Sequence, residues 1–317
     1  MKIIMFIKKI GQCIKIFAAS VVIILALFSI SPIYNWEEPA PFSGDKIYNP
    51  YAGSDSGAIY RRATFHTHTK VDKGINECPY YPDVVYDDYA ALGYDIVAFT
   101  NHNALTEHPY DERLDLYGYE HGYNLFKFHN NVFGAHSVQK YDILIPFFDS
   151  HKQYKMNLAR KHGDFVVFNH PDRTIGITSR TMERLSGYRL IEGDSGFQER
   201  DGGEGTYLHL WDEALSAGRY SHNVLSDDNH DSKNPERIAR RSTWINTPSA
   251  EYFDVKEALL AGDFYSMRTP AGFPADSLPK VVNVGLRGDT LFLTLSRPAR
   301  SIEAISQNGE VRRSVTG

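Results

Sequence analysis

The chain has 317 residues, of which 42% are hydrophobic and 23% charged, so it is long enough for one large α/β domain or two medium ones and is neither disordered nor fibrous. Lysine and arginine number 34 against 39 acidic residues, and four of the lysines precede an apolar N-terminal run. The rest of the chain has 30 basic and 39 acidic residues, a net charge of −9, which argues against a nucleic-acid partner bound through its phosphates.

The N-terminus has the pattern of an export signal. Four lysines, the last of them Lys15, precede the uncharged apolar run Ile16 to Ile30. No clean cleavage site follows, and the run is short for a membrane span, so an uncleaved signal-anchor is favoured while a cleaved signal peptide stays open. We expect a leader at residues 1–33 and a linker at 34–59. The protein would then be exported, either anchored and facing the periplasm or cell exterior, or secreted if the leader is cleaved.

Apolar runs typical of short strands alternate with helical patterns after the linker. The runs are ATFHTH, YDIVAFTNH, FKFHNNVFGAH, DFVVFNHP, YRLIEGD, NVLSDDNH and STWIN. Five amphipathic patterns stand between them, and each ends at a glycine, as helices commonly do: Gly93, Gly163, Gly187, Gly218 and Gly262. This alternation predicts a mostly parallel sheet, as a barrel or a doubly wound fold.

Histidines follow these predicted strands. His66 and His68 are two residues apart, so in an extended strand both rings point to the same face. Strand ends gather at one mouth in a barrel, whereas a doubly wound sheet would focus them at one switch point. The distribution therefore favours a barrel with a metal site at its mouth. The other polar residues at or near strand ends are His102, His129, His170, Asp228 and His230.

The motifs FHTHT, FTNHN, YGYEHG, FHNNVFG, FNHPDR and LSDDNHD occur in this order between residues 60 and 265. In that order they resemble the polymerase and histidinol phosphatase (PHP) family of metallohydrolases. The segments WDEALSAGRYSHNVLSDDNHD and VKEALLAGDFYS resemble its exported single-domain members, which are often described as metal-dependent phosphoesterases. The resemblance implies a distorted (β/α)7 barrel, expected here at residues 60–276, with a site for two or three metals.

The resemblance also implies a set of metal ligands, in which Glu120 bridges two ions. Imidazoles and carboxylates suit divalent zinc, manganese or iron, and clustered cations convert a trapped water into a hydroxide nucleophile. The ligands implied are His66, His68, Glu120 and Asp228 for the first metal, Glu120, His129 and His170 for the second, and His102 and His230 for the third.

Two positions depart from the family pattern. Asn101 stands in TNHN where the family has a carboxylate, which weakens the expectation of a third metal. Asp72, in VDKG, lies one residue closer to the histidine pair than the family's aspartate. Asp72 is therefore either a third-metal ligand or a solvated loop residue.

Three further residues near the motifs have open roles. Arg173, in HPDR, would bind a phosphate with its guanidinium, or would close its loop by a salt bridge. His121 and His136 are expected to be structural or to support the ligands, with His136 in reserve as a ligand if His129 points away.

The last segment changes character. From about Ser277, alternating apolar positions with turns at RGD and QNGE predict three or four antiparallel strands. We expect a small β appendage at residues 277–317.

The expected function is hydrolysis of a phosphomonoester or phosphodiester by metal-activated hydroxide at a di- or trinuclear site. A carbamate, ester or amide hydrolase on the same metals stays open, as does a non-catalytic binding protein derived from the fold. The expected partners are a small-molecule phosphoester and the membrane, reached through the N-terminal segment. Neither a nucleic acid nor a protein partner is implied.

Overall fold

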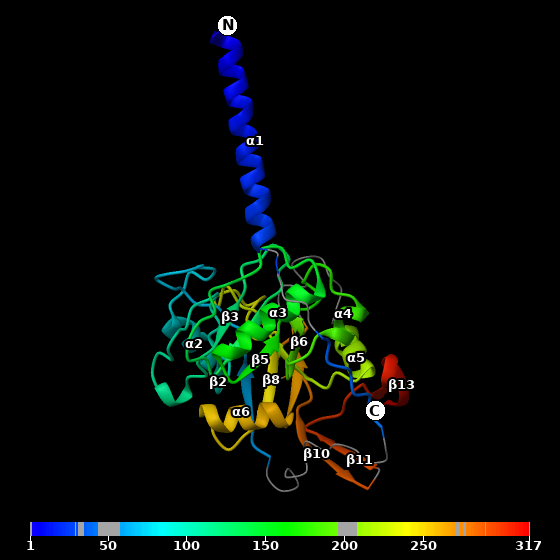
Figure 1. Ribbon diagram of the computed structural model, residues 1–317. Helices are drawn as coiled ribbons and strands as arrows, with labels where there is room; N and C mark the ends of the chain where they lie inside the picture. The colour runs from blue at the N-terminus through cyan, green and yellow to red at the C-terminus, as the bar shows by residue number, and fades with distance from the viewer. Residues whose placement is uncertain are drawn as a thin grey trace.

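The computed structural model describes residues 2–28, 30, 35–43, 58–195, 208–270, 273–274, 277–288 and 290–316. Its first helix, α1 (Lys2–Phe28), projects away from the body of the molecule (Figure 1). The segment Ile4–Leu27 is long and apolar enough to cross a membrane, and none of it is buried. The helix is compatible with a signal-anchor and with a signal peptide. Most of the expected linker, residues 34 and 44–57, lies outside the described residues.

The described part of the expected linker, residues 35–43, lies against the body. The Ala40 amide donates a hydrogen bond to the Gly218 carbonyl at 3.2 Å, and Arg219 donates from Nη1 to the Glu38 carbonyl at 3.4 Å. The Phe42 ring meets Tyr220 edge-on, with 5.7 Å between ring centroids. We call residues 35–43 the docked segment.

Two mixed sheets form the body (Figure 1). The first has the order β2–β1–β8–β9, and the second has the order β3–β4–β5–β6–β7. Strands β1 and β2 are parallel, as are β5, β6 and β7, whereas the other pairs are antiparallel. The strands are β1 (Tyr60–Thr64), β2 (Ile96–Val97), β3 (Tyr119–His121), β4 (Asn130–Phe133), β5 (Phe165–Phe168), β6 (Leu190–Ser195), β7 (His222–Ser226), β8 (Arg241–Asn246) and β9 (Phe264–Arg268).

The predicted (β/α)7 barrel is wrong, because the described strands form several separate sheets of a mixed α/β fold and do not close on themselves. A (β/α)7 barrel is built from successive parallel strands, but β3, β4 and β5 are antiparallel neighbours, and so are β1, β8 and β9. At the junction of the sheets, β7 meets β8 through one side chain. Thr243 Oγ1 accepts from the Leu225 amide and donates to the Leu225 carbonyl, both at 3.1 Å, in place of a continuous ladder.

All five helices predicted after the leader are present. Thr178 caps α4 by accepting a hydrogen bond from the Thr181 amide at 3.2 Å, and α6 ends at Gly262 in the left-handed conformation. The helices are α2 (Pro82–Ala91), α3 (Asp149–Ala159), α4 (Ser179–Arg184), α5 (Leu208–Ala217) and α6 (Tyr252–Ala261), with short 3-10 turns at Glu112–Leu114, Arg160–His162 and Gln307–Gly309.

Both faces of the five-stranded sheet are covered. One core cluster places Phe65, Val167 and Ile245 with Leu259 of α6, so it lies between the two sheets. Another places Phe168 with residues of α3, α4 and α5 on the opposite face. The two clusters hold the strand ends in place, and the candidate site is built on those ends.

Four antiparallel strands follow the body, within the segment expected as a β appendage. They pair as two separate hairpins, β10 (Val281–Arg287) with β11 (Thr290–Leu295) and β12 (Ser301–Ser306) with β13 (Glu310–Thr316). The second hairpin touches α5, because the Asn308 amide donates to Ser216 Oγ at 2.9 Å.

Candidate metal centre

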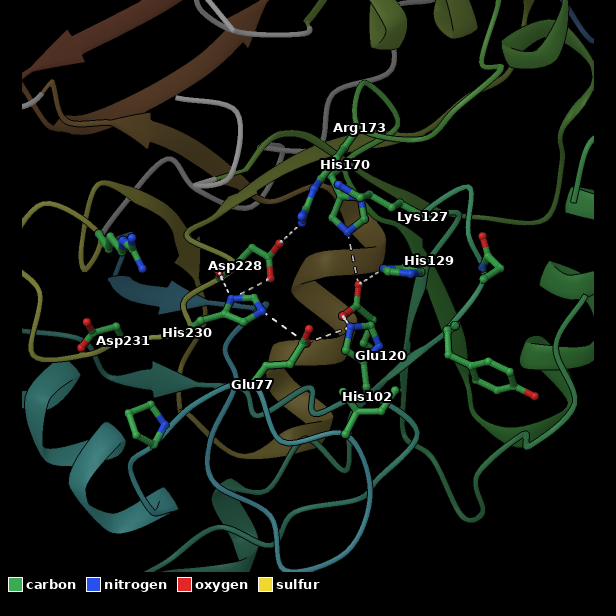
Figure 2. A pocket seen from close by; sticks show the side chains of 16 residues that line it. Glu77, His102, Glu120, Lys127, His129, His170, Arg173, Asp228, His230 and Asp231 are labelled. Atoms are coloured by element: carbon green, nitrogen blue, oxygen red, sulfur yellow. Dashed lines mark hydrogen bonds and ion pairs between the residues drawn. The ribbon is translucent and has the colours of Figure 1, made fainter. Parts of the chain in front are cut away.

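The candidate centre lies where the C-terminal ends of strands from both sheets meet. Isolated parallel bridges join Thr67 to Asn229 and His102 to Glu120, so the segments after β1, β2 and β7 converge on β3. A pocket of about 640 Å³ opens beside them, and Figure 2 shows its lining side chains. Among the described residues, five overlapping groups of three potential metal ligands have ligand atoms within 4.8 Å of one another.

Glu120 lies at the middle of the cluster and is only 1% exposed. Its Oε2 is 3.4 Å from Nε2 of both His66 and His68. Its Oε1 is 3.1 Å from His129 Nδ1 and 3.2 Å from His170 Nε2 (Figure 2 shows the latter two contacts). The two oxygens of one buried carboxylate therefore face two different groups of imidazoles, which is the arrangement a carboxylate needs to span two cations.

Asp228 completes the first of these groups. Its Oδ1 lies 3.2 Å from His66 Nε2 and 3.1 Å from His68 Nε2. Asp228 and His170 have positive φ angles of 49° and 26°, which are strained for residues other than glycine. Such outliers are concentrated at functional sites, where the backbone aims a particular side chain.

Glu77 joins the remaining two predicted ligands and was missed by the sequence analysis. Its Oε2 lies 3.0 Å from His102 Nε2 and 3.3 Å from His230 Nε2. His102 Nε2 also lies 3.1 Å from Glu120 Oε2, so this third group adjoins the first. Asp72 is exposed and belongs to none of the ligand groups found in the described chain. Glu77, and not Asp72, thus lies at this third group.

Glu192, on β6, is a second carboxylate that the sequence analysis missed. Its two oxygens lie 3.2 and 3.1 Å from His66 Nδ1, on the opposite side of the ring from Glu120. Glu192 Oε2 also accepts a hydrogen bond from the His170 amide at 3.2 Å. A carboxylate on the outer nitrogen of a ligating histidine fixes the tautomer and the ring orientation.

The charges in the cluster fit a cation site. Burial raises the pKa of Glu120, but the surrounding His102 and His66 bring it well below its usual range, so the carboxylate stays ionised. Burial lowers the pKa of His68 and of His129 to about 4, so both rings are neutral near pH 7, the form that binds metal. His66 Nε2 is buried and has no hydrogen-bond partner among the described atoms, although it points at two carboxylates. Burial lowers the pKa of His66, but Asp228, Glu192 and Glu120 together raise it well above its usual value. Without a cation the ring therefore holds a proton, which a bound cation would displace.

Three other residues singled out in the sequence have structural contacts. Asn101 Oδ1 accepts from the Thr69 amide at 2.7 Å, which fixes the loop after the histidine pair. His121 Nε2 lies 3.0 Å from the Tyr141 carbonyl, and His136 stacks on His162. Because His129 points at Glu120, the reserve candidate His136 is not needed as a ligand.

Two basic side chains line the pocket beside the cluster. Arg173 Nη1 lies 3.6 Å from Asp228 Oδ2, and its side chain is 19% exposed. Lys127, which the sequence analysis did not select, also lines the pocket. Figure 2 shows both on the side of Glu120 where His129 and His170 lie.

Comparisons with known proteins leave the chain without an assigned family. No protein-family model and no curated protein matches it. It is similar to the crystal structure of a two-domain protein from Bacteroides vulgatus that contains a predicted PHP-like metal-dependent phosphoesterase. That likeness has 15% sequence identity and a TM-score of 0.48, and it covers 75% of this chain and 70% of the other. At this level it identifies neither the family nor the reaction, so the function is inferred from the site.

Proposed function

We propose that the chain is an exported, metal-dependent phosphoesterase. The observation that carries the proposal is Glu120, a buried carboxylate whose two oxygens face two different groups of histidines. Residues 60–276 would form the catalytic unit and residues 277–317 a β appendage. Divalent cations bound there would polarise a phosphoryl oxygen and activate water for attack on phosphorus, so no protein nucleophile is required.

The proposed ligands place three carboxylates around the cations. Three divalent ions against these three carboxylates and Glu192, which lies beside them at His66, leave a net charge of about +2, and zinc, manganese and iron all suit this donor set. A positive centre favours a phosphoester anion over a neutral ester, carbamate or amide. The ligands are His66, His68, Glu120 and Asp228 for one ion, Glu120, His129 and His170 for a second, and Glu77, His102 and His230 for a third.

Arg173 and Lys127 would bind the substrate in this proposal. Arg173 is held beside Asp228 and lines the pocket, so its guanidinium would contact a phosphoryl oxygen bound at the cluster. Lys127 adds a second positive charge on the same side of the pocket. Both would stabilise the additional negative charge that develops on the phosphoryl oxygens during hydrolysis.

Glu120→Gln tests the proposal. We expect loss of one or both bridged metals and a fall in turnover on the order of 10²-fold, because an amide cannot bridge two cations as a carboxylate does. The measurements are metal content of the purified protein and hydrolysis of chromogenic phosphate and carboxyl esters. Glu257→Gln on α6 is the matched control for Glu120→Gln. A second test is His129→Ala, which removes another proposed ligand, and His136→Ala is its control.

The panel separates the open functions. Phosphate release supports the proposal, cleavage of carboxyl esters alone supports the second hydrolase class, and no turnover with full metal occupancy supports a binding protein. Near-normal metal content and turnover in Glu120→Gln would remove Glu120 as the bridge.

We also propose that α1 anchors the body on the far side of the membrane, because lysines before an apolar run keep the N-terminus inside. Added protease should digest the body in spheroplasts of cells that express the chain. Protection of the body would contradict this topology.

A further inference from the structure

A group of exposed apolar side chains borders the pocket. Leu125, Phe147, Phe148 and Ile175 are 62%, 64%, 60% and 54% exposed. We call these four residues the apolar rim. Single exposed apolar residues are ordinary, but several that adjoin one another next to a polar pocket mark a surface that contacts an apolar ligand or a membrane.

The rim residues come from three loops that are bonded to one another. The Leu125 amide donates to the Leu144 carbonyl at 2.9 Å, which joins the first loop to the segment before Phe147. The Ile175 amide donates to the Phe126 carbonyl, also at 2.9 Å. The Phe126 and Phe147 rings lie 6.2 Å apart between centroids, and the Phe147 and Phe148 rings 5.1 Å. The three loops that carry the rim residues are therefore held next to one another.

Two of these loops also carry the basic residues of the pocket. Lys127 follows Leu125 by two positions, and Arg173 precedes Ile175 by two. The Cα atom of each basic residue therefore lies within about 7 Å of the Cα atom of a rim residue. Thr174 Oγ1 donates to the Lys127 carbonyl at 3.0 Å and ties the two loops together. A substrate whose phosphate lies between Lys127 and Arg173 would place the atoms beyond its ester oxygen next to the rim.

The short connection after α1 keeps the body close to the membrane that α1 would cross. Trp36, in the docked segment, lies under the Arg184 guanidinium, which is 5.3 Å from its ring centroid. Only seven residues lie between Phe28 at the end of α1 and Trp36, and the eight steps along the chain reach about 29 Å when fully extended. In Figure 1, α1 stands at the end of the body formed by cyan and green loops, and β10 and β11 lie at the opposite end.

We propose that the substrate is the phosphoester headgroup of a membrane lipid, with its acyl chains lying against the apolar rim. This inference rests on the proposed phosphoesterase function and specifies its substrate class. Water would supply the oxygen that attacks phosphorus, the bond from phosphorus to the glycerol oxygen would break, and a proton would pass to the leaving alkoxide. The products would be a free phosphate, or a phosphomonoester, and an alcohol that retains the acyl chains.

The test compares chain lengths on one enzyme. The full chain, in phosphatidylcholine nanodiscs and loaded with manganese or zinc, is given the dibutanoyl and dioctanoyl forms of phosphatidic acid and of phosphatidylglycerol. For at least one of these two lipids, we expect kcat/KM to be at least about tenfold higher for the dioctanoyl form than for the dibutanoyl form, because the longer chains cover more of the rim. Leu125→Ser combined with Phe147→Ser should reduce this preference about tenfold, and metal content and melting temperature should stay as in the wild type.

A matched control removes two equally exposed apolar residues elsewhere. Phe253 on α6 and Leu291 on β11 are 68% and 63% exposed, so Phe253→Ser with Leu291→Ser makes the same chemical change away from the pocket. This control should keep the chain-length preference. Lipid partitions into the discs equally for every variant. A difference in chain-length preference between the two double variants therefore reports the effect of the rim alone.

The outcomes distinguish the two levels of inference. If neither lipids nor p-nitrophenyl phosphates are hydrolysed, the phosphoesterase function fails and the lipid substrate with it. If p-nitrophenyl phosphates are hydrolysed but the preference is absent, or is unchanged by the rim substitutions, only the lipid substrate is overturned.

Discussion

Replacing Lys155 with methionine tests whether a buried ion pair holds the loop that enters the candidate site. Lys155 and Asp142 are both fully buried, and Lys155 Nζ forms a salt bridge with Asp142 Oδ1 and donates to the Phe128 carbonyl at 3.0 Å. The other oxygen of Asp142 accepts from the Tyr123 amide at 2.8 Å and from Asn124 Nδ2 at 3.2 Å. The pair therefore connects α3 to the loop between β3 and β4.

The magnitude follows from what each substitution leaves behind. Lys155→Met leaves the Asp142 carboxylate buried without a counter-charge, which costs about 3–5 kcal/mol in the free energy of unfolding. Adding Asp142→Asn removes the charge, and the amide oxygen still accepts from the Tyr123 amide. The double variant is left with an amide N–H that lacks an acceptor, at about 1–3 kcal/mol. We expect the double variant to be more stable than the single one.

Urea unfolding of the detergent-solubilised full chain, followed by tryptophan fluorescence, measures both variants. A loss below about 1 kcal/mol in Lys155→Met would show that the carboxylate is solvated or protonated without the lysine, contrary to its buried position. A double variant as unstable as the single one would show that packing of the lysine stem matters more than its charge.

Three further predictions concern the site and its surroundings. Glu192→Gln should weaken metal binding by about 10–100-fold, measured by titration with a competing chelator, because the contact that orients His66 is lost; unchanged affinity would leave Glu192 a purely structural role. Arg173→Lys should raise KM for phosphoesters about tenfold with little change in kcat, since a lysine cannot form a bidentate contact; an unchanged KM would place Arg173 outside substrate binding. Burial and then Arg189 lower the pKa of His222 from 6.5 to about 4, so below pH 6.5 the unfolded state takes up a proton that the folded state does not. Wild-type stability should therefore fall between pH 7 and pH 5 by about 1 kcal/mol more than that of His222→Gln, in urea unfolding at both pH values.

The sequence indicated the cluster more reliably than the fold around it. His66, His102 and His170 follow apolar strands, and strand ends converge in a barrel and in the observed pair of sheets alike, so their proximity did not depend on which fold was right. The sequence contained no comparable signal for whether neighbouring strands are parallel or antiparallel. The helix α6 lies between β8 and β9 just as a crossover helix would, yet the two strands are antiparallel, because periodicity reports burial and not direction.

The two missed carboxylates show where pattern reasoning fails. Glu77 belongs to a loop without periodicity, and only the three-dimensional course of that loop brings it, and not Asp72, to His102 and His230. Glu192 lies inside the buried strand β6, where a charged residue is costly unless it is paired. A glutamate in a strand predicted to be buried was itself the available signal, since a buried charge requires a partner.

The positive φ angles of His170 and Asp228 set a trade-off between stability and function. Each such residue costs on the order of 1–3 kcal/mol that a glycine at the same position would avoid, so the most stabilising substitutions at these positions are ones that delete a proposed ligand. Selection for thermal stability alone would therefore erode the centre. Stabilised variants obtained without a functional screen should accumulate glycine at positions 170 and 228, and a screen that retains metal binding should keep histidine and aspartate there.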